Sequence, residues 1–377
     1  MAGNLRDSSD SSRLWKTEKV GAPAIFFSPT SGLGNSMLAL ISTTQLAKKL
    51  NAPFAVDWSR DTSPSCQASF QDLFMKFHTD AGELNSCSRS CELDLTQRGK
   101  MSCWRVIACG SKQQIEQIFH NCNCVRVRSN QFYLPALQPQ TRKLESNFRL
   151  IAETHLNPSV SISHRIALSK ESWEKEFGVT HIMGVHVRAA HANDGVINGN
   201  WIPKKKTFER IFWPCLQRAI AELHGQAEVI GVFVAADTPE VRTEASLLLS
   251  LDDRVVELPT PLKTIPNDTG LGPLRTSDVV QDAALELFLL KESDSLFVKH
   301  GIKFDSTFSA SAMALAQCDS STSCYFVEQN KCEVVTAPVI PDFHLQEKIS
   351  CDNFMPEDVD SCELRSKNPP STGAVDW

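Results

Sequence analysis

The chain has 377 residues, is 42% hydrophobic and carries a formal net charge of -6 at pH 7. This length exceeds one ordinary domain, so we expect two domains, each able to bury its own core. The weakly acidic charge, without a basic patch, excludes a nucleic-acid footprint and favours a small-molecule or carbohydrate ligand. Nor does the sequence contain a run of about 18 apolar residues that would predict a membrane span.

The first elements of the chain follow the pattern strand, glycine turn, helix, strand. Apolar residues at helical spacing identify the helix. This pattern is typical of the opening unit of a doubly wound parallel sheet. The four elements are predicted at Ala24–Ser28, Pro29–Asn35, Ser36–Leu50 and Pro53–Val56, and Asp57 and Trp58 follow the last of them.

Residues 59 to about 130 are predicted as cysteine-rich loops with one helical piece at Ser111–Phe119, and helical segments follow between Leu134 and Leu168. The second half of the chain is more regular. Strands and helices alternate there four times, which indicates a parallel Rossmann-like sheet. Its strands are expected at 182–187, 229–235, 254–258 and 295–299, and its helices at 206–223, 240–249, 278–291 and 309–316.

The thirteen cysteines fall into two groups with one residue, Cys215, between them. The first group is Cys66, Cys87, Cys91, Cys103, Cys109, Cys122 and Cys124, and the second is Cys318, Cys324, Cys332, Cys351 and Cys362. Loop-rich surroundings predict disulfides, whereas the paired spacing of zinc sites is missing. We expect at least three disulfides, formed separately within the two groups, with Cys215 free in a helix core.

Disulfides imply an oxidising compartment. The segment Met1 to Thr17 is polar, however, and lacks the apolar stretch of a secretory signal. Either the start of the gene product is absent from this sequence or the cysteines are reduced. We expect the first, which places the protein in the Golgi or ER lumen, with the cytoplasm as the alternative.

The run Met183-Gly184-Val185-His186-Val187-Arg188 is an apolar strand that ends on an arginine. Ligands of open α/β sheets collect at the carboxyl ends of the strands, so Arg188 would lie where a phosphate binds. Arginine suits this place because its planar fork forms two hydrogen bonds to phosphate and stays charged. The alternative is that Arg188 only forms a surface ion pair.

Four stretches of the sequence, in this order, resemble motifs of the GT-B fucosyltransferase superfamily. This superfamily includes the α1,2-, α1,6- and protein O-fucosyltransferases, and the likeness is closest in motif detail to the rhizobial nodulation type. Each motif alone is weak, but the ordered set, over roughly residues 21 to 318, is fairly specific. The stretches are Gly32-Leu33-Gly34-Asn35 with the later Asp57-Trp58, Gly184 to Arg188, Phe233 to Val241, and Asp278 to Asp282 with Ser306-Thr307-Phe308-Ser309.

The resemblance implies an α/β fold of the GT-B type, with two Rossmann-like doubly wound domains facing a cleft. It implies a polar segment over 1–20, an acceptor-side domain with a cysteine-rich insert over 21–165, a GDP-sugar-binding domain over 178–337 and a loop-rich tail over 338–377. In the family, the arginine that corresponds to Arg188 contacts the β-phosphate of GDP-fucose. The donor-binding residues carried over by the likeness are His186, Asp237, Asp282, Ser306, Phe308, Ser309, Gly34 and Asn35.

The chemistry of glycosyl transfer agrees with these positions. Negative charge develops on the leaving diphosphate, so a fixed cation there stabilises the transition state. Arg188 would replace a divalent metal, and helix N-termini after Gly34 and at Thr307–Ser309 would add backbone N–H groups. We therefore expect no metal and no cofactor, with GDP-fucose as co-substrate. His186 is either a structural histidine or a phosphate donor, and Asp237 is either a ligand-binding residue or a helix cap.

The base for the acceptor hydroxyl is predicted among Asp194, His191 and Asp57. Asp57 would alternatively bind acceptor sugars, with Trp58 stacking on a sugar ring. The predicted activity is an inverting transfer of fucose to a glycan or glycoprotein. Two alternatives are a non-catalytic sugar-binding or nucleotide-sugar-binding protein, favoured by the unusual Ala189-Ala190 after Arg188, and a GT-B enzyme with another nucleotide sugar.

Overall fold

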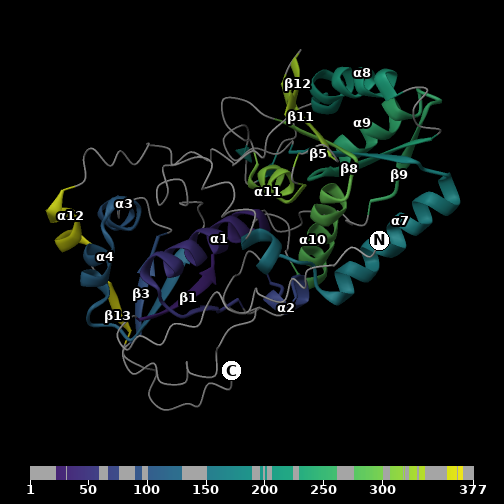
Figure 1. Ribbon diagram of the computed structural model, residues 1–377. Coiled ribbons are helices and arrows are strands. Elements are labelled where there is room, and N and C mark those ends of the chain that lie inside the picture. The colour runs from purple at the N-terminus through teal and green to yellow at the C-terminus, as the bar shows by residue number, and fades with distance from the viewer. Residues whose placement is uncertain are drawn as a thin grey trace, which may run out of the picture.

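The computed structural model contains two α/β units, each built around a largely parallel sheet (Figure 1). The described residues are 23–30, 32–58, 67–75, 90–95, 101–129, 151–188, 196–197, 200–201, 206–223, 229–260, 276–299, 306–316, 318, 322–328, 331–335, 355–362 and 364–367. The α/β class predicted from the alternation of strands and helices is confirmed.

The second sheet has six strands in the order β12-β11-β10-β5-β8-β9. All neighbours pair in parallel except β11 and β12. The order reverses between β5 and β10, which is the switch point where doubly wound sheets bind ligands. All four strands predicted for this half are confirmed. The strands are β5 (His181–Val187), β8 (Ile230–Ala236), β9 (Val255–Leu258), β10 (Ser295–Lys299), β11 (Ser323–Glu328) and β12 (Lys331–Val335).

Helices connect the parallel strands of this sheet as predicted. The first begins with a π-helical turn and continues as a regular helix, and the later ones start one or two residues before the predicted positions. They are η3 (Phe208–Phe212), α8 (Trp213–Leu223), α9 (Pro239–Leu249), α10 (Ser277–Lys291) and α11 (Thr307–Ala316). The two-residue strands β6 (Val196–Ile197) and β7 (Asn200–Trp201) form a separate antiparallel pair.

The first sheet has five strands in the order β13-β3-β4-β1-β2. Its parallel strands are β1 (Ala24–Pro29), β2 (Phe54–Val56), β3 (Ser90–Asp94) and β4 (Cys124–Ser129), and β13 (Arg365–Lys367) is antiparallel to β3. The prediction that this cysteine-rich region consists of loops and one helical piece was wrong, because the region also supplies β3 and β4. Charged residues interrupt both strands and hide the usual apolar run. The charges pair across the sheet instead, with Arg128 Nη1 3.4 Å from Glu92 Oε1.

The same region also contains two helices, of which only the second was predicted. They are α3 (Met101–Cys109) and α4 (Lys112–Phe119), and Ser111 caps the latter by accepting from the backbone N–H of Gln114. The tail predicted as loop-rich holds α12 (Pro356–Ser361) as well as β13. Two more helices, α2 (Phe70–Leu73) and α7 (Val160–Phe177), lie toward the second sheet (Figure 1).

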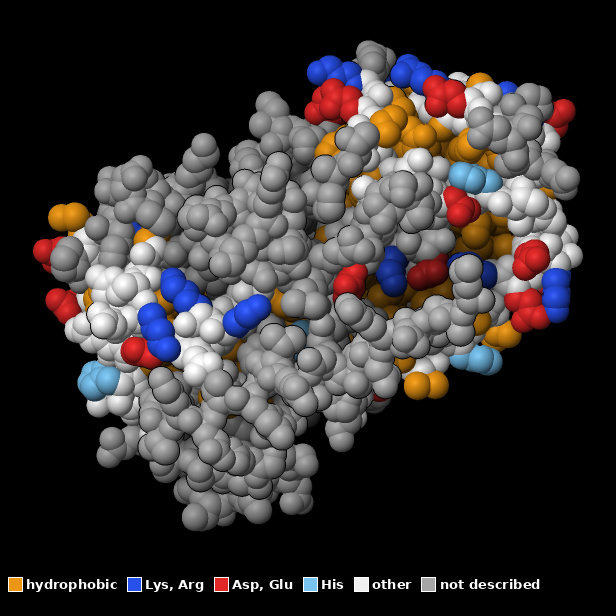
Figure 2. Space-filling view, in the orientation of Figure 1, with side chains coloured by type: hydrophobic (Ala, Val, Ile, Leu, Met, Phe, Trp, Pro, Cys, Tyr) orange, Lys and Arg blue, Asp and Glu red, His pale blue; other side chains and the backbone are white. Residues whose placement is uncertain are grey.

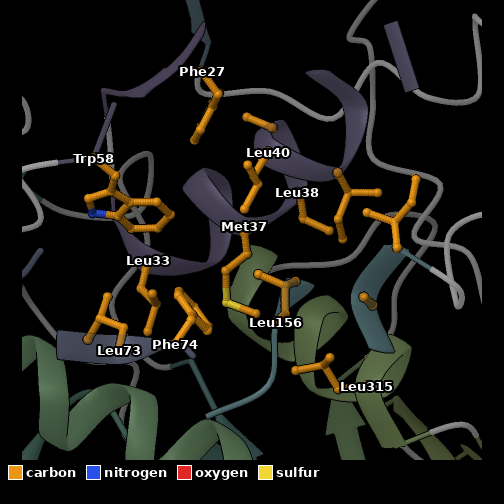
Figure 3. Packing of buried hydrophobic residues seen from close by; sticks show 14 of the residues in the cluster. Phe27, Leu33, Met37, Leu38, Leu40, Trp58, Leu73, Phe74, Leu156 and Leu315 are labelled. Carbon is orange, nitrogen blue, oxygen red and sulfur yellow. The ribbon is translucent and has the colours of Figure 1, made fainter. Parts of the chain in front are cut away.

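Helix α1 (Leu33–Leu50) lies between the two units and is buried along most of its length (Figure 1). It begins three residues before the predicted start. One continuous hydrophobic cluster runs from β1 through α1 to α10 and α11 (Figure 3). The first unit thus shares one continuous core with one face of the second unit. A second cluster, on the opposite face of the second sheet, packs η3 and α8 against β5 and β8.

Four disulfides join described cysteines, in agreement with the predicted minimum of three, and Cys109 and Cys124 are also disulfide-bonded. The four pairs are Cys91–Cys122, Cys103–Cys362, Cys215–Cys332 and Cys318–Cys324. Two expectations were wrong. Cys215 is not free, because α8 brings it within a Cα distance of 5.5 Å of Cys332 on β12. Cys103–Cys362 links the two groups, because the tail returns to α3. Cys66, Cys87 and Cys351 lie outside the described residues.

Candidate functional site

Arg188 and Asp237 are the first residues beyond two neighbouring strands of the second sheet. Val187 at the end of β5 pairs with Ala236 at the end of β8, so the next residue of each strand emerges at the same edge. Nε of Arg188 lies 3.2 Å from Oδ2 of Asp237. Their side chains are 33% and 16% exposed, so the pair is half-buried. The structure thus brings together the arginine and the aspartate of two predicted donor motifs. The cap of α9 is the neighbouring residue Thr238, whose hydroxyl accepts from Val241.

His186 points to the opposite face of β5 from Val185 and Val187, toward α11. Its Nδ1 lies 2.6 Å from the hydroxyl oxygen of Ser309, and its ring stacks on Phe308 with the centroids 4.9 Å apart. Burial, together with the nearby charge of Arg188, lowers the pKa of His186 to about 3. The imidazole is therefore neutral at neutral pH. One ring nitrogen donates a hydrogen bond and the other accepts.

The N-terminus of α11 carries the remaining residues of this motif. The hydroxyl of Ser306 accepts a hydrogen bond from the backbone N–H of Phe308 at 3.2 Å, and its carbonyl accepts from Ala310. Ser306 therefore caps the helix. This cap explains why α11 starts at Thr307, two residues before the predicted start.

Gly34 in the first turn of α1 lies directly against the first turn of α11. A Cβ on Gly34 would come within 2.8 Å of the backbone N of Phe308 and the backbone carbonyl carbon of Thr307. The hydroxyl of Ser311 donates to the carbonyl of Thr307 at 2.8 Å, and its oxygen also lies 3.5 Å from the carbonyl oxygen of Gly34. Two segments 277 residues apart in sequence thus place two helix N-termini side by side. Helix N-termini attract anions, because their first backbone N–H groups have no partner in the helix.

Two polar atoms near this contact are buried and have no hydrogen-bond partner among the residues that the structure describes. They are Oδ1 of Asn35 and Oγ1 of Thr30. Buried polar side-chain atoms almost always have a partner, so such atoms beside a candidate site favour a ligand that supplies one. Asn35 was predicted as a donor-binding residue. Thr30 was missed, although a hydroxyl between a strand and a glycine turn is a usable signal.

The residues predicted for the acceptor side lie at the end of β2. Oδ2 of Asp57 lies 3.0 Å from Nη2 of Arg126 on β4. Trp58 is only 4% exposed, and its ring contacts the rings of Phe27, Phe70 and Phe74. Figure 3 shows the indole turned toward α1. The prediction that Trp58 stacks on a sugar ring was therefore wrong, because other side chains already cover its faces.

Asp282 was predicted as a donor-binding residue on the strength of its motif. Its carboxylate instead forms an ion pair with Arg165 of α7. The predicted base candidates His191 and Asp194 lie outside the described residues. Within the ranges described above, no three His, Cys, Asp or Glu side chains form a group that could hold a metal ion. No described helix is long and apolar enough to cross a bilayer.

Comparison with known proteins identifies the class of fold. Neither a protein-family model nor a curated protein matches the chain. A mutant of Arabidopsis thaliana FUT1 in complex with GDP is similar in structure, at 14% identity and a TM-score of 0.55, over 87% of this chain and 78% of that one. The chain therefore has an α/β fold of the GT-B type, similar to that of FUT1.

Two further solved structures are similar over most of their length. NodZ α1,6-fucosyltransferase soaked with GDP-fucose is 14% identical, with a TM-score of 0.48, over 84% of this chain and 100% of that one. POFUT1 in complex with GDP-fucose is 14% identical, with a TM-score of 0.48, over 82% of this chain and 99% of that one.

Proposed function

We propose that the chain is an inverting, metal-independent fucosyltransferase that transfers fucose from GDP-fucose to a glycan or glycoprotein. The observation that carries the proposal is the Arg188–Asp237 pair at the ends of β5 and β8, next to the switch point of the sheet. The N-termini of α1 and α11 and the neutral His186 belong to the predicted donor motifs as well. A fixed cation with backbone N–H donors is the environment that a diphosphate requires.

In the proposed reaction, the acceptor oxygen forms a bond to the anomeric carbon while the bond from that carbon to the phosphate oxygen breaks. The electron pair leaves with GDP, and its charge develops beside the guanidinium of Arg188. Asp237 orients this guanidinium through the ion pair between its Oδ2 and Nε of Arg188. A positioned cation performs the role that a divalent metal has in other transferases, and this supports a reaction without metal.

The proton of the acceptor hydroxyl passes to a base predicted among His191, Asp194 and Asp57. Asp57 lies in an ion pair with Arg126, so that arginine would have to share the carboxylate with the acceptor. Donor-side contacts are proposed for Asn35 and Thr30. A donor-side contact is also proposed for Asp282, whose carboxylate would then have to bind the donor in competition with Arg165. The four disulfides support the further proposal that the protein works in an oxidising lumen such as the Golgi.

The test is an assay of the full chain with GDP-fucose and a panel of oligosaccharide and glycoprotein acceptors, in buffer with and without EDTA. We expect fucosylated product with equimolar release of GDP, at a rate that chelation leaves unchanged. Binding of GDP without turnover of any donor would instead indicate a non-catalytic nucleotide-binding protein. Turnover of a different nucleotide sugar would support a glycosyltransferase of this fold and contradict GDP-fucose as its donor.

A further inference from the structure

A second ion pair lies behind the Arg188–Asp237 pair and is more deeply buried. It joins Arg242 in the first turns of α9 to Glu286 in the middle of α10, with Nη2 3.2 Å from Oε1. The two side chains are 14% and 4% exposed. Figure 2 shows charged side chains of both signs side by side in the middle of the visible face, over the place where Figure 1 has α10.

The same two atoms also form hydrogen bonds at the carboxyl ends of two strands. Nη2 of Arg242 donates to the backbone carbonyl of Ala236 at 2.9 Å, and Ala236 is the residue directly before Asp237. Oε1 of Glu286 also accepts from the hydroxyl of Thr260, two residues beyond the end of β9. One carboxylate oxygen and one guanidinium nitrogen thus connect α9 and α10 to the carboxyl edge of β8 and β9.

A buried ion pair contributes little net stability, because removing both charges from water offsets most of their attraction. Removing one partner has a larger effect, because the other charge stays buried without compensation. The stability of the fold therefore does not by itself account for this pair. The position of the pair next to Asp237 accounts for its presence better. The hydrogen bond from Arg242 fixes the backbone carbonyl of Ala236, and this constrains the direction of the Asp237 side chain.

We propose that Arg242 and Glu286 are positioning residues that hold Asp237, and through it the guanidinium of Arg188, in the orientation that binds the diphosphate of a nucleotide. This inference rests on the proposed function only in taking Arg188 as the phosphate ligand. Neither Arg242 nor Glu286 needs to touch the nucleotide.

The first test measures the dissociation constant of GDP for Glu286→Gln by calorimetry. Glutamine keeps the shape and an acceptor oxygen but removes the negative charge that faces Arg242. Residues that act through a neighbour typically change affinity by about threefold to thirtyfold, and we expect weakening in this range. The matched control is Asp252→Asn, which breaks the ion pair between Asp252 and Arg254 at the opposite, amino end of β9. The control should leave the affinity for GDP unchanged.

Two further variants separate positioning from plain destabilisation. In a double-mutant cycle, Glu286→Gln should weaken GDP binding much less in the Asp237→Asn background than in the wild type. Independent, multiplicative effects would overturn the proposal. Arg242→Lys should recover part of the affinity that Arg242→Met loses, because a single ammonium can donate to both Ala236 and Glu286. Equal losses in the two variants would count against a hydrogen-bonding role.

A crystal structure of Glu286→Gln without nucleotide tests the positioning role directly, because it shows the distance between Arg188 and Asp237. We expect the Arg188–Asp237 contact, 3.2 Å in the wild type, to be lost or displaced. An unchanged contact would overturn the positioning role even if the protein transfers fucose. A displaced contact in a protein that binds no GDP would support the positioning role while contradicting the proposed function.

Discussion

Gly34 and Phe308 are in direct contact, and this contact leaves no room for a side chain at position 34. Both atoms nearest to a Cβ at this position belong to the backbone of α11, so neither can rotate away. The contact unites a glycine motif near the start of the chain with a serine-phenylalanine motif near its end. It therefore fixes how the two α/β units are placed around the candidate donor site.

Gly34→Ala should destabilise the protein and weaken its binding of GDP. Alanine raises helix propensity by about 1 kcal/mol, but overpacking against a backbone typically costs about 1–3 kcal/mol, so we expect a net loss. Chemical denaturation measures the first effect and calorimetry with GDP the second. Lys48→Ala, at an exposed position of the same helix, is the control. A Gly34→Ala protein of wild-type stability and affinity would show that α1 and α11 do not touch in solution.

Arg188→Ala should abolish transfer while leaving the fold intact. Losing a charge-assisted phosphate contact in a shielded site should raise the transition-state free energy by about 3 kcal/mol or more, which lowers kcat/KM at least about a hundredfold. Arg188→Lys should not rescue activity, because a point charge cannot replace the planar fork. Circular dichroism checks the fold of both variants. Near wild-type transfer by the alanine variant would contradict the assignment of Arg188.

The buried His186 should make the protein sensitive to acid. Its pKa is lowered from about 6.5 to about 3 in the folded state, so the unfolded chain binds the proton more readily. Stability is full above the unfolded pKa and is lost as the pH falls from about 6.5 toward 3. At pH 5 the loss from this one group is about 2 kcal/mol.

The measurement for His186 is the free energy of unfolding from urea titrations at pH 7 and pH 5, for the wild type and His186→Gln. The wild type should lose about 2 kcal/mol more than the variant between the two pH values. Groups that titrate in both proteins, such as His155, cancel in this comparison. An equal loss in the two proteins would mean that the pKa of His186 is not lowered in the folded state.

The disulfides should differ in their contribution to stability. Cys103–Cys362 spans 259 residues and Cys318–Cys324 spans only 6. Removing a link that closes a longer loop frees more chain entropy in the unfolded state, so removing the first should cost about 3 kcal/mol more than removing the second. Replacing both cysteines of a pair by serine, followed by denaturant unfolding, gives the two values. Mass spectrometry after alkylation under nonreducing denaturation would first establish the pairs, and modification of all thirteen thiols would contradict them.

Four of the six strands of the second sheet could be predicted from the sequence, because each of these four is a short apolar run next to a clear helical segment, whereas β11 and β12 were missed. Arg188, Asp237 and Ser309 could be placed in one site because parallel strands end at the same edge and His186 must face one side of β5. Asp282 could not be placed, since its partner Arg165 belongs to a helix 117 residues earlier. A motif indicates which residues are candidates, but not which neighbouring charge already binds them.

The first sheet was harder to predict for a different reason. Glu92 and Arg128 look like surface residues in the sequence, and only the pairing of β3 with β4 reveals that they neutralise each other. The disulfide partners of Cys103 and Cys215 could not be predicted either, since helix α3 and strand β12 had not been predicted. Trp58 was misjudged because its position after a strand indicates exposure, while Phe27 of β1 and two phenylalanines of the α2 segment bury it.

The return of β13 and α12 to the first unit has a consequence for biosynthesis. A ribosome makes the chain from its N-terminus, so β1 to β4 leave the exit tunnel long before the strand that completes the edge of their sheet. During this interval β3 presents an open edge, and Cys103 is an unpaired thiol whose partner has not yet been translated. Folding of the first unit therefore ends only after the second unit has been synthesised.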